Sequence, residues 1–267
     1  MKKITRELRE KQMQILDEIE KICEKHNLIY FLSEGTLLGA IRHKGFIPWD
    51  DDLDISMPRE DYEKFKIIAM NELNKKHELD YFKTNKHYFL PFIKVREKKT
   101  IYLEKKLINY MGLKGIFVDI FPLDDTKKPN SYLMKFQSKL EHIIAATLSF
   151  KSRVIHNRSK KEKVFLTLLS VLPFKFLVWL QDKVMTFQNN SKCKYFASYG
   201  ITPKKKPAYE KEKLLPTKKA IYENRVYNIP NDSDYYLKVL YGDYMTLPPK
   251  EKRKSHKPIK IEFDNRK

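Results

Sequence analysis

Four aspartates crowded into five residues, in the segment WDDDLDISM, constrain this chain more than any other feature of its sequence. If the segment is an extended strand, its side chains alternate between two faces. Asp50, Asp52 and Asp54 then share one face, and Leu53 and Ile55 point the other way, into a core. An acidic surface loop is the alternative, but the apolar flanks favour a packed segment. We therefore predict a buried strand that carries carboxylates along one side.

Carboxylates that lie so close together predict a bound cation. Ionising all of them is unfavourable unless a positive charge lies between them. Ligand sets made only of oxygen favour a hard ion, Mg²⁺ or Mn²⁺, over zinc. Alternation leaves Asp51 out of the ligand set, so the expected metal ligands are Asp50, Asp52 and Asp54.

A Gly-Thr pair precedes the acidic segment at a position suited to phosphate binding. Residues 28–32 resemble a short strand and residues 37–41 can open a helix, so Gly35 and Thr36 lie in the turn between them. Backbone N–H groups at a helix start have no partner inside the helix and favour anions. Arg42 follows near the helix end, and we expect it to face a bound phosphate.

A lone acid, Asp119, interrupts the apolar segment IFVDIFPL. Burying an isolated carboxylate is expensive unless it finds a partner. Either a Lys or Arg pairs with Asp119, or Asp119 completes the metal site begun at Asp50. The second interpretation is favoured, because buried acids in strands are often functional. Pro122 is expected to end this strand.

The remaining chain is expected to alternate between helices and strands before it becomes helical. Lys94 and Arg96 share one face of a strand predicted over residues 88–96. The other predicted elements are helices over 4–26 and 58–74, a strand over 101–103, helices through 131–188 with breaks near Asn157 and Pro173, a basic mobile loop over 189–220, a short helix over 232–243 and a loosely held tail.

Bulk composition excludes several classes of protein. The 267 residues, 42% of them hydrophobic, can build a substantial core. Only Cys23 and Cys193 are present, which argues against a disulfide framework and suits a reducing cytoplasm. The formal net charge of +20 predicts attraction to polyanions. The most apolar window, Val164–Leu180, is broken by Pro173 and Lys175, so we expect a buried helix pair or a helix on an anionic membrane surface.

Three segments of the chain resemble the LicD/fukutin family of phosphotransferases. They are GTLLGAIRHKGFIPWDDDLDISM at 35–57, FVDIFPLD at 117–124 and YLKVLYGDYMTLPP at 236–249, in the family's order. The resemblance implies an α/β (α+β) fold with a nucleotidyltransferase-like mixed sheet flanked by helices. Residues 1–125 would form this catalytic core, and the mainly helical and basic-loop region 126–267 would complete the same domain.

The resemblance also implies a function and a set of site residues. Bacterial members transfer phosphocholine from CDP-choline to sugars of surface glycans, which include lipopolysaccharide, teichoic acid and capsule. The matching residues are Gly35 and Thr36 at the nucleotide phosphates, Asp50, Asp52 and Asp54 as Mg²⁺ ligands, and Asp119 as a further ligand or as the base.

The chemistry of phosphoryl transfer agrees with this assignment. The charge of the donor must be neutralised, and the acceptor hydroxyl must be aligned with the leaving oxygen. Arg42, Lys94 and Arg96 are candidates for holding phosphate oxygens. Asp119 could accept the proton of the sugar hydroxyl, and Trp49 could face a quaternary ammonium headgroup.

The leading hypothesis is Mg²⁺-dependent transfer of phosphocholine, or of a similar phospho-alcohol, to a lipid-linked glycan with release of CMP. We expect a cytoplasmic protein that is peripheral at the inner face of the membrane. A nucleotidyltransferase that moves an NMP onto a small hydroxyl compound is the enzymatic alternative. A basic nucleic-acid-binding module would also suit the net charge, but RNP, KH and zinc signatures are absent from the sequence, so we expect no nucleic-acid partner.

Overall fold

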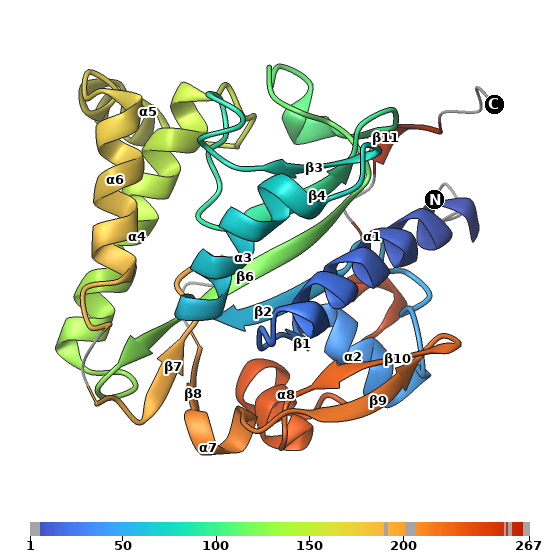
Figure 1. Ribbon diagram of the computed structural model, residues 1–267. Helices are drawn as coiled ribbons and strands as arrows, with labels where there is room; N and C mark the ends of the chain where they lie inside the picture. The colour runs from blue at the N-terminus through green and yellow to red at the C-terminus, as the bar shows by residue number, and fades with distance from the viewer. Residues whose placement is uncertain (1–5, 190–191, 201–206, 254, 256–257, 264–267) are drawn as a thin grey trace.

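A mixed β-sheet built around strand β6 (Phe117–Thr126) organises the chain (Figure 1). The computed structural model describes residues 6–189, 192–200, 207–253, 255 and 258–263. The strands follow the order β1 (Phe31–Leu32), β2 (Asp54–Pro58), β6, β4 (Ile93–Glu97) and β3 (His77–Asp80), with β7 (Tyr195–Ala197) paired to the far half of β6 and β8 (Ala208–Glu210) paired to β7. Strand β2 is parallel to β6, whereas β4 and β7 are antiparallel to it.

Two helices cover one face of this sheet. Helix α1 (Arg6–Lys25) and helix α3 (Arg59–Glu72) both pack against β6, and both lie in front of the sheet in Figure 1. Side chains alternate along β6, so the fully buried Val118 and Ile120 point into the core beneath these helices. Asp119, between them, points to the opposite side of the sheet, where it lines a cleft.

The other elements surround this sheet. Helix α2 (Glu34–His43) leads from β1 toward the acidic segment. Helices α4 (Tyr132–Lys151), α5 (Lys160–Leu169) and α6 (Phe174–Met185) form a layer at one side of the molecule (Figure 1). The smaller elements are β5 (Ile101–Glu104), η1 (Lys105–Leu107), α7 (Lys211–Leu214), β9 (Lys218–Tyr222), β10 (Arg225–Ile229), α8 (Ser233–Tyr241), η2 (Lys250–Lys252) and β11 (Pro258–Glu262).

The predicted α/β class and most of the predicted elements are confirmed. Helices α1, α3 and α8, strand β5 and the helical region with its two breaks lie where the sequence places them. Residues 4 and 5 of the first predicted helix lie outside the described residues. Across the described residues, no single helix has the length and hydropathy to cross a membrane. Helices α5 and α6 reach that length and hydropathy only when taken together, and the pair is bent by 100°.

The prediction that Pro122 ends its strand is wrong. The Asp119 N–H donates to the carbonyl of Leu53, the residue before β2, at 2.8 Å. Amide positions alternate along a strand, so those of Val118, Ile120 and Pro122 face the other side. On that side the pairing with β4 stops at Ile120, and pairing with β7 starts only at Asp124. Because proline lies in the gap between two partners, its missing N–H breaks no ladder bond, and β6 continues to Thr126.

The predicted basic loop over 189–220 and the loosely held tail also need correction. Strands β7, β8 and β9 and helix α7 occupy the described part of the first region, and β11 pairs with β5 in the second. Residues 190–191, 201–206, 254, 256–257 and 264–267 lie outside the described residues. Tyr209, Leu214 and Tyr222 are buried in the same core as Ile55, so apolar residues between the lysines fix this part of the chain.

A buried ion pair ties α3 to β6. The Arg59 Nε and Nη2 atoms each donate to the Asp124 carboxylate at 2.7 Å, and Asp124 is fully buried. We expect Arg59→Met to lower the free energy of unfolding by about 3–5 kcal/mol, because it leaves a buried carboxylate without its cationic partner and only the Asn189 amide to bond it. Urea denaturation measures this loss.

The matched control is Lys64→Met, which removes an exposed pair with Glu60 on the same helix. Exposed pairs of this kind contribute little to stability, because water and salt screen them. Equal losses in the two variants would contradict the assigned role of Arg59.

Candidate active site

The acidic segment is an irregular connection that enters β2, and the prediction of a strand from Asp50 onward is wrong for its first four residues. Strand β2 starts at Asp54. Its neighbour β1 pairs only with Ile55 and Ser56, and the Gln12 side chain donates to the Asp51 carbonyl at 2.9 Å. Before Asp54 the backbone is therefore held by single hydrogen bonds, from the Gln12 side chain to Asp51 and from the Asp119 N–H of β6 to Leu53, and not by a continuous strand ladder. Ile55 is fully buried as predicted.

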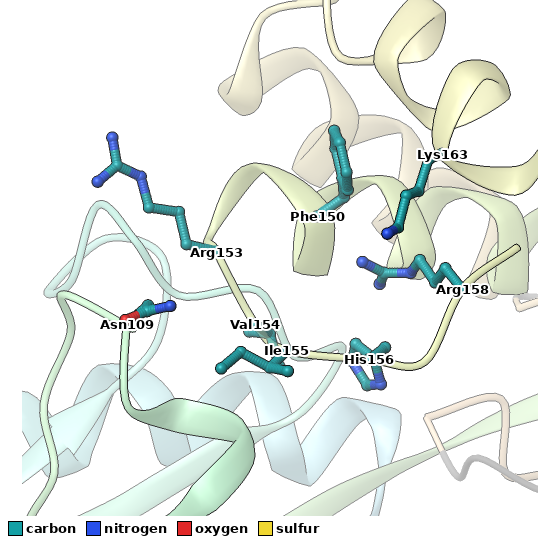
Figure 2. Close-up of a pocket in the computed structure, with 8 residues that line it drawn as sticks. All are labelled: Asn109, Phe150, Arg153, Val154, Ile155, His156, Arg158 and Lys163. Carbon is teal, nitrogen blue, oxygen red and sulfur yellow. The ribbon is translucent and has the colours of Figure 1, made fainter. Parts of the chain in front are cut away.

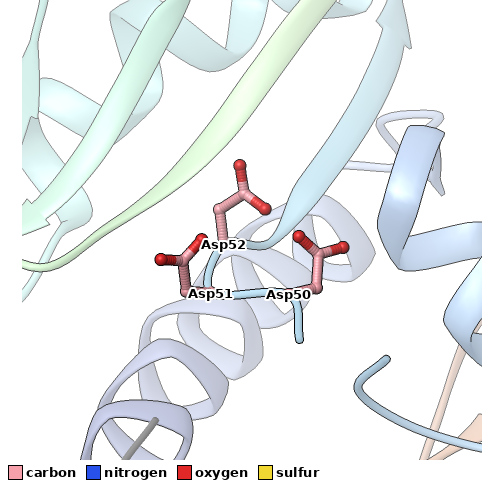
Figure 3. Close-up of side chains that lie close together, drawn as sticks. All are labelled: Asp50, Asp51 and Asp52. Atoms are coloured by element: carbon pink, nitrogen blue, oxygen red, sulfur yellow. The ribbon is translucent and has the colours of Figure 1, made fainter. Parts of the chain in front are cut away.

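The structure brings Asp119 to the acidic segment. Asp54 and Asp119 are direct partners on the parallel strands β2 and β6. One carboxylate oxygen each from Asp52, Asp54 and Asp119 lie within 4.8 Å of one another. Asp50, Asp51 and Asp52 form a second group of the same tightness (Figure 3). Asp52 belongs to both groups, so the carboxylates make one continuous cluster.

Electrostatics within the cluster are unfavourable in the absence of a cation. Burial raises the pKa of Asp54 well above its usual range, and the charges of Asp52, Asp119 and Asp50 raise it further. Burial also raises the pKa of Asp119, although Lys94 opposes this shift. A set of oxygen donors that repel one another in this way fits a hard divalent cation.

Asp119 lies beside both a basic side chain and the acidic segment. The Lys94 ammonium forms a buried ion pair with Asp119 Oδ1 and lies 3.5 Å from the centre of the Phe117 ring. Burial lowers the pKa of Lys94, and the Asp119 charge opposes that shift. Asp119 therefore has a basic partner and also joins the carboxylate cluster.

The Gly-Thr pair lies against the cluster. The Thr36 hydroxyl accepts a hydrogen bond from the Asp54 N–H at 2.7 Å, so the start of α2 is tied to the start of β2. A Cβ atom on Gly35 would lie 2.5 Å from Asp50 Oδ2, closer than atoms can approach. Glycine at this position therefore leaves room for the Asp50 carboxylate.

Two residues of the site were missed by the sequence reasoning. Glu34 adopts a left-handed conformation with φ of 47°, and its carboxylate accepts a hydrogen bond from the Tyr236 hydroxyl at 2.9 Å. Burial raises the pKa of Glu34 to about 7; Tyr236 opposes this shift and the charge of Asp52 adds to it. Two features of the sequence could have pointed to them. Glu34 lies in the predicted turn beside Gly35, and Tyr236 lies in the third segment that resembles the family.

Three of the predicted phosphate or headgroup ligands have other partners. Arg42 donates to the Tyr244 carbonyl, and Arg96 pairs with Asp80 and donates to the Gly115 carbonyl. The guanidinium of Arg253 lies over the Trp49 ring at 4.4 Å. Ligand roles for Arg42, Arg96 and Trp49 remain predictions. In the structure these three side chains contact other parts of the protein.

A cleft of about 550 Å³ lies beside the cluster. Asp119 and Lys94 line it from the sheet, and α4 and α5 supply the facing wall through residues such as His142 and Phe165. Aromatic side chains make up much of its surface: Tyr88, Phe89, Phe92, Tyr102, Tyr110, Phe117 and Phe121. Rings of this kind can stack on a sugar or another flat or apolar group.

Gly35 and Thr36 lie in the first turn of helix α2 and not, as predicted, in a turn before it. Their position after β1, followed by carboxylates on two parallel neighbours of a mixed sheet, defines a nucleotidyltransferase-type site. Residues 27–161 match the family model described as LicD/FKTN/FKRP, nucleotidyltransferase domain. The chain is also 31% identical over 267 residues to the lipopolysaccharide cholinephosphotransferase LicD of Haemophilus influenzae, across 96% of this chain and 97% of that relative. This chain belongs to the LicD family, and it is a transferase.

Shorter similarities extend to proteins without a described function. An uncharacterised protein of Rickettsia typhi is 46% identical over 55 residues, which cover 21% of this chain and 18% of that protein. An uncharacterised protein of Rickettsia prowazekii is 48% identical over 48 residues, 18% of each chain.

The raised pKa of Asp54 predicts how stability depends on pH when divalent ions are chelated. The native state holds the Asp54 proton to a higher pH than the unfolded chain, so stability falls as pH rises above about 4, the unfolded pKa of an aspartate. We expect Asp54→Asn to unfold at a higher temperature than the wild type at pH 7, and to show a shallower decline between pH 5 and 8.

Melting curves in EDTA measure this effect, with Glu60→Gln, an exposed carboxylate on α3, as the control. If Asp54→Asn loses stability with pH as steeply as the wild type, ionisation of Asp54 does not destabilise the native state.

Proposed function

We propose that this protein transfers phosphocholine, or a similar phospho-alcohol, from a CDP-linked donor to a sugar hydroxyl of a cell-surface glycan such as lipopolysaccharide, with release of CMP. The observation that carries the proposal is the end-to-end relationship to a lipopolysaccharide cholinephosphotransferase, over 96% of this chain and 97% of the relative. An alignment of that extent spans both halves of the carboxylate cluster.

The cluster fits a divalent cation, and we assign Mg²⁺ or Mn²⁺ to it. Asp52, Asp54 and Asp119 would hold the ion, because their oxygens converge within 4.8 Å and their charges are otherwise in conflict. When bound, such an ion neutralises charge on the donor diphosphate and stabilises the leaving CMP.

Side chains of this chain would perform the remaining steps. Lys94 holds Asp119 in place and brings a positive charge to the floor of the cleft, where the transferred phosphoryl group would lie. Asp119 also lines the cleft, and in the alternative to its ligand role it would accept the proton of the sugar hydroxyl. The aromatic walls position the acceptor and limit access of water, which would otherwise hydrolyse the donor.

We place the reaction at the cytoplasmic face of the membrane, on a glycan that is linked to a lipid. The proposed donor is a nucleotide and is therefore supplied from the cytoplasm. An acceptor that will later reach the cell surface must be presented on that side by a carrier, and a lipid is a carrier that also crosses the membrane.

Replacing one carboxylate should remove turnover. We expect Asp52→Asn to lower the rate of CMP release at least ~10²-fold, because amide oxygens cannot supply the missing negative charge. Purified protein, radiolabelled CDP-choline, Mg²⁺ and lipopolysaccharide or lipid-linked acceptors provide the assay, and Glu60→Gln should keep full activity.

Phosphorus NMR of the same reaction separates the enzymatic alternatives. CMP from CDP-choline supports the proposal, whereas pyrophosphate released from CTP, in a parallel reaction with a small hydroxyl compound, would identify a nucleotidyltransferase instead. Wild-type protein that releases CMP with none of the acceptors would count against phosphocholine transfer.

Metal binding has a readout that does not need substrate. We expect Mg²⁺ or Mn²⁺ at 100 times its dissociation constant to stabilise the wild type by about 2.7 kcal/mol. Differential scanning fluorimetry measures the rise in melting temperature, which should be strongly reduced in Asp52→Asn. An equal rise in both proteins would place the ion elsewhere.

A further inference from the structure

The outer helices α5 and α6 expose large apolar side chains. Leu166 is the buried residue of α5, whereas Leu168 and, just beyond the helix, Val171 are 68% and 83% exposed. On α6, Phe176 and Trp179 are about half exposed and their rings stack at 5.7 Å. Large apolar side chains exposed on successive helices mark a place of contact with a partner or a membrane.

The same region is strongly basic. Residues 151–183 contain eight Lys or Arg residues and two acids, Glu162 and Asp182. The Glu162 carboxylate is engaged by the Ser159 N–H at 2.7 Å, in the cap of α5, and Asp182 lies 3.5 Å from Arg59. The cationic groups of this region therefore far outnumber the carboxylates beside them.

Several of these cations line one cavity. It has a volume of about 600 Å³ and lies where the end of α4 meets the start of α5 (Figure 2). Its charged or titratable lining residues, within the described parts of the chain, are Arg153, His156, Arg158 and Lys163. Figure 2 shows the end groups of Arg158 and Lys163 turned toward each other. Two like charges that converge in this way favour an anion between them.

We propose that α5, α6 and this basic cavity form a docking surface for an anionic phospholipid membrane. The cavity would take a lipid phosphate, and Leu168, Val171 and Trp179 would enter the boundary between headgroups and acyl chains. Apolar insertion and basic attraction together provide the two signals that stable attachment requires. The 100° bend between α5 and α6 suits a pair that lies on the surface.

The placement of the surface is consistent with the chemistry, although the inference does not rest on the proposed function. The active-site cleft shares Val154, His156 and Arg158 with the basic cavity and reaches Phe165 on α5. A membrane docked here would lie at one end of the cleft that contains Asp119. An acceptor carried by a lipid could then enter the cleft without leaving the bilayer.

Vesicle flotation tests the proposal. Wild-type protein should float with vesicles of phosphatidylcholine and phosphatidylglycerol and much less with phosphatidylcholine alone. The double variant L168E/V171E should bind about 10-fold less, because charge replaces apolar side chains at the lipid boundary. R153Q/K163Q should lose binding to anionic vesicles specifically, and 0.5 M salt should weaken wild-type binding.

The matched control is I221E/V226E, which places two glutamates on exposed apolar positions of the β9–β10 hairpin. It should bind like the wild type. The proposal is overturned if the wild type does not float with anionic vesicles, or if L168E/V171E and the control bind alike. It is also overturned if L168E/V171E only converts a dimer into a monomer in light scattering, since the occupant is then a second copy of the chain.

An activity assay separates this proposal from the proposed function. With a soluble, delipidated acceptor, L168E/V171E should release CMP at the wild-type rate, because neither residue lines the cleft. A loss of flotation with full activity supports the docking surface, and flotation of a protein without transferase activity would leave docking intact and remove the proposed function.

Discussion

The parallel pairing of β2 with β6 is the constraint on which the site depends, because it sets Asp54 beside Asp119. Parallel neighbours cannot be joined by a tight turn, so the chain must travel through α3, β3 and β4 before it returns as β6. Helix α3, together with α1, buries one face of the sheet. Since side chains alternate, the charged residues are left on the other face, and the apolar residues between them hold the repelling carboxylates in place.

How much of this could be predicted from the sequence depends on whether a signal is local. The burial of Ile55 and the meeting of Asp119 with the acidic segment follow from alternation and from the cost of an isolated buried charge. The start of β2 at Asp54 does not follow from a local signal. It depends on the length of β1 and on the side chain of Gln12, which comes from helix α1. Pro122 is a similar case: a missing donor matters only if a partner strand is present.

Contacts between the two ends of the chain were beyond the sequence reasoning for the same reason. Tyr236 reaches Glu34, and Glu223 accepts a hydrogen bond from the Phe46 N–H at 3.0 Å, across 202 and 177 positions of sequence. No periodicity encodes such distances. The many lysines of the region before residue 220 also suggested a mobile loop, although the tyrosines between them are the residues that pack. The lysine-rich composition reflects the exposed side of this region and gives no sign of the tyrosines on its buried side.

The division of the carboxylate cluster between two strands has a consequence for tracing the activity through evolution. Asp54 and Asp119 are 65 positions apart, so a local similarity of 55 or 48 residues, like those to the two Rickettsia proteins, cannot include both. Under the proposed function, a descendant could keep the acidic motif unchanged and still lose activity through one substitution at position 119. Inheritance of the chemistry must therefore be judged from both strands together.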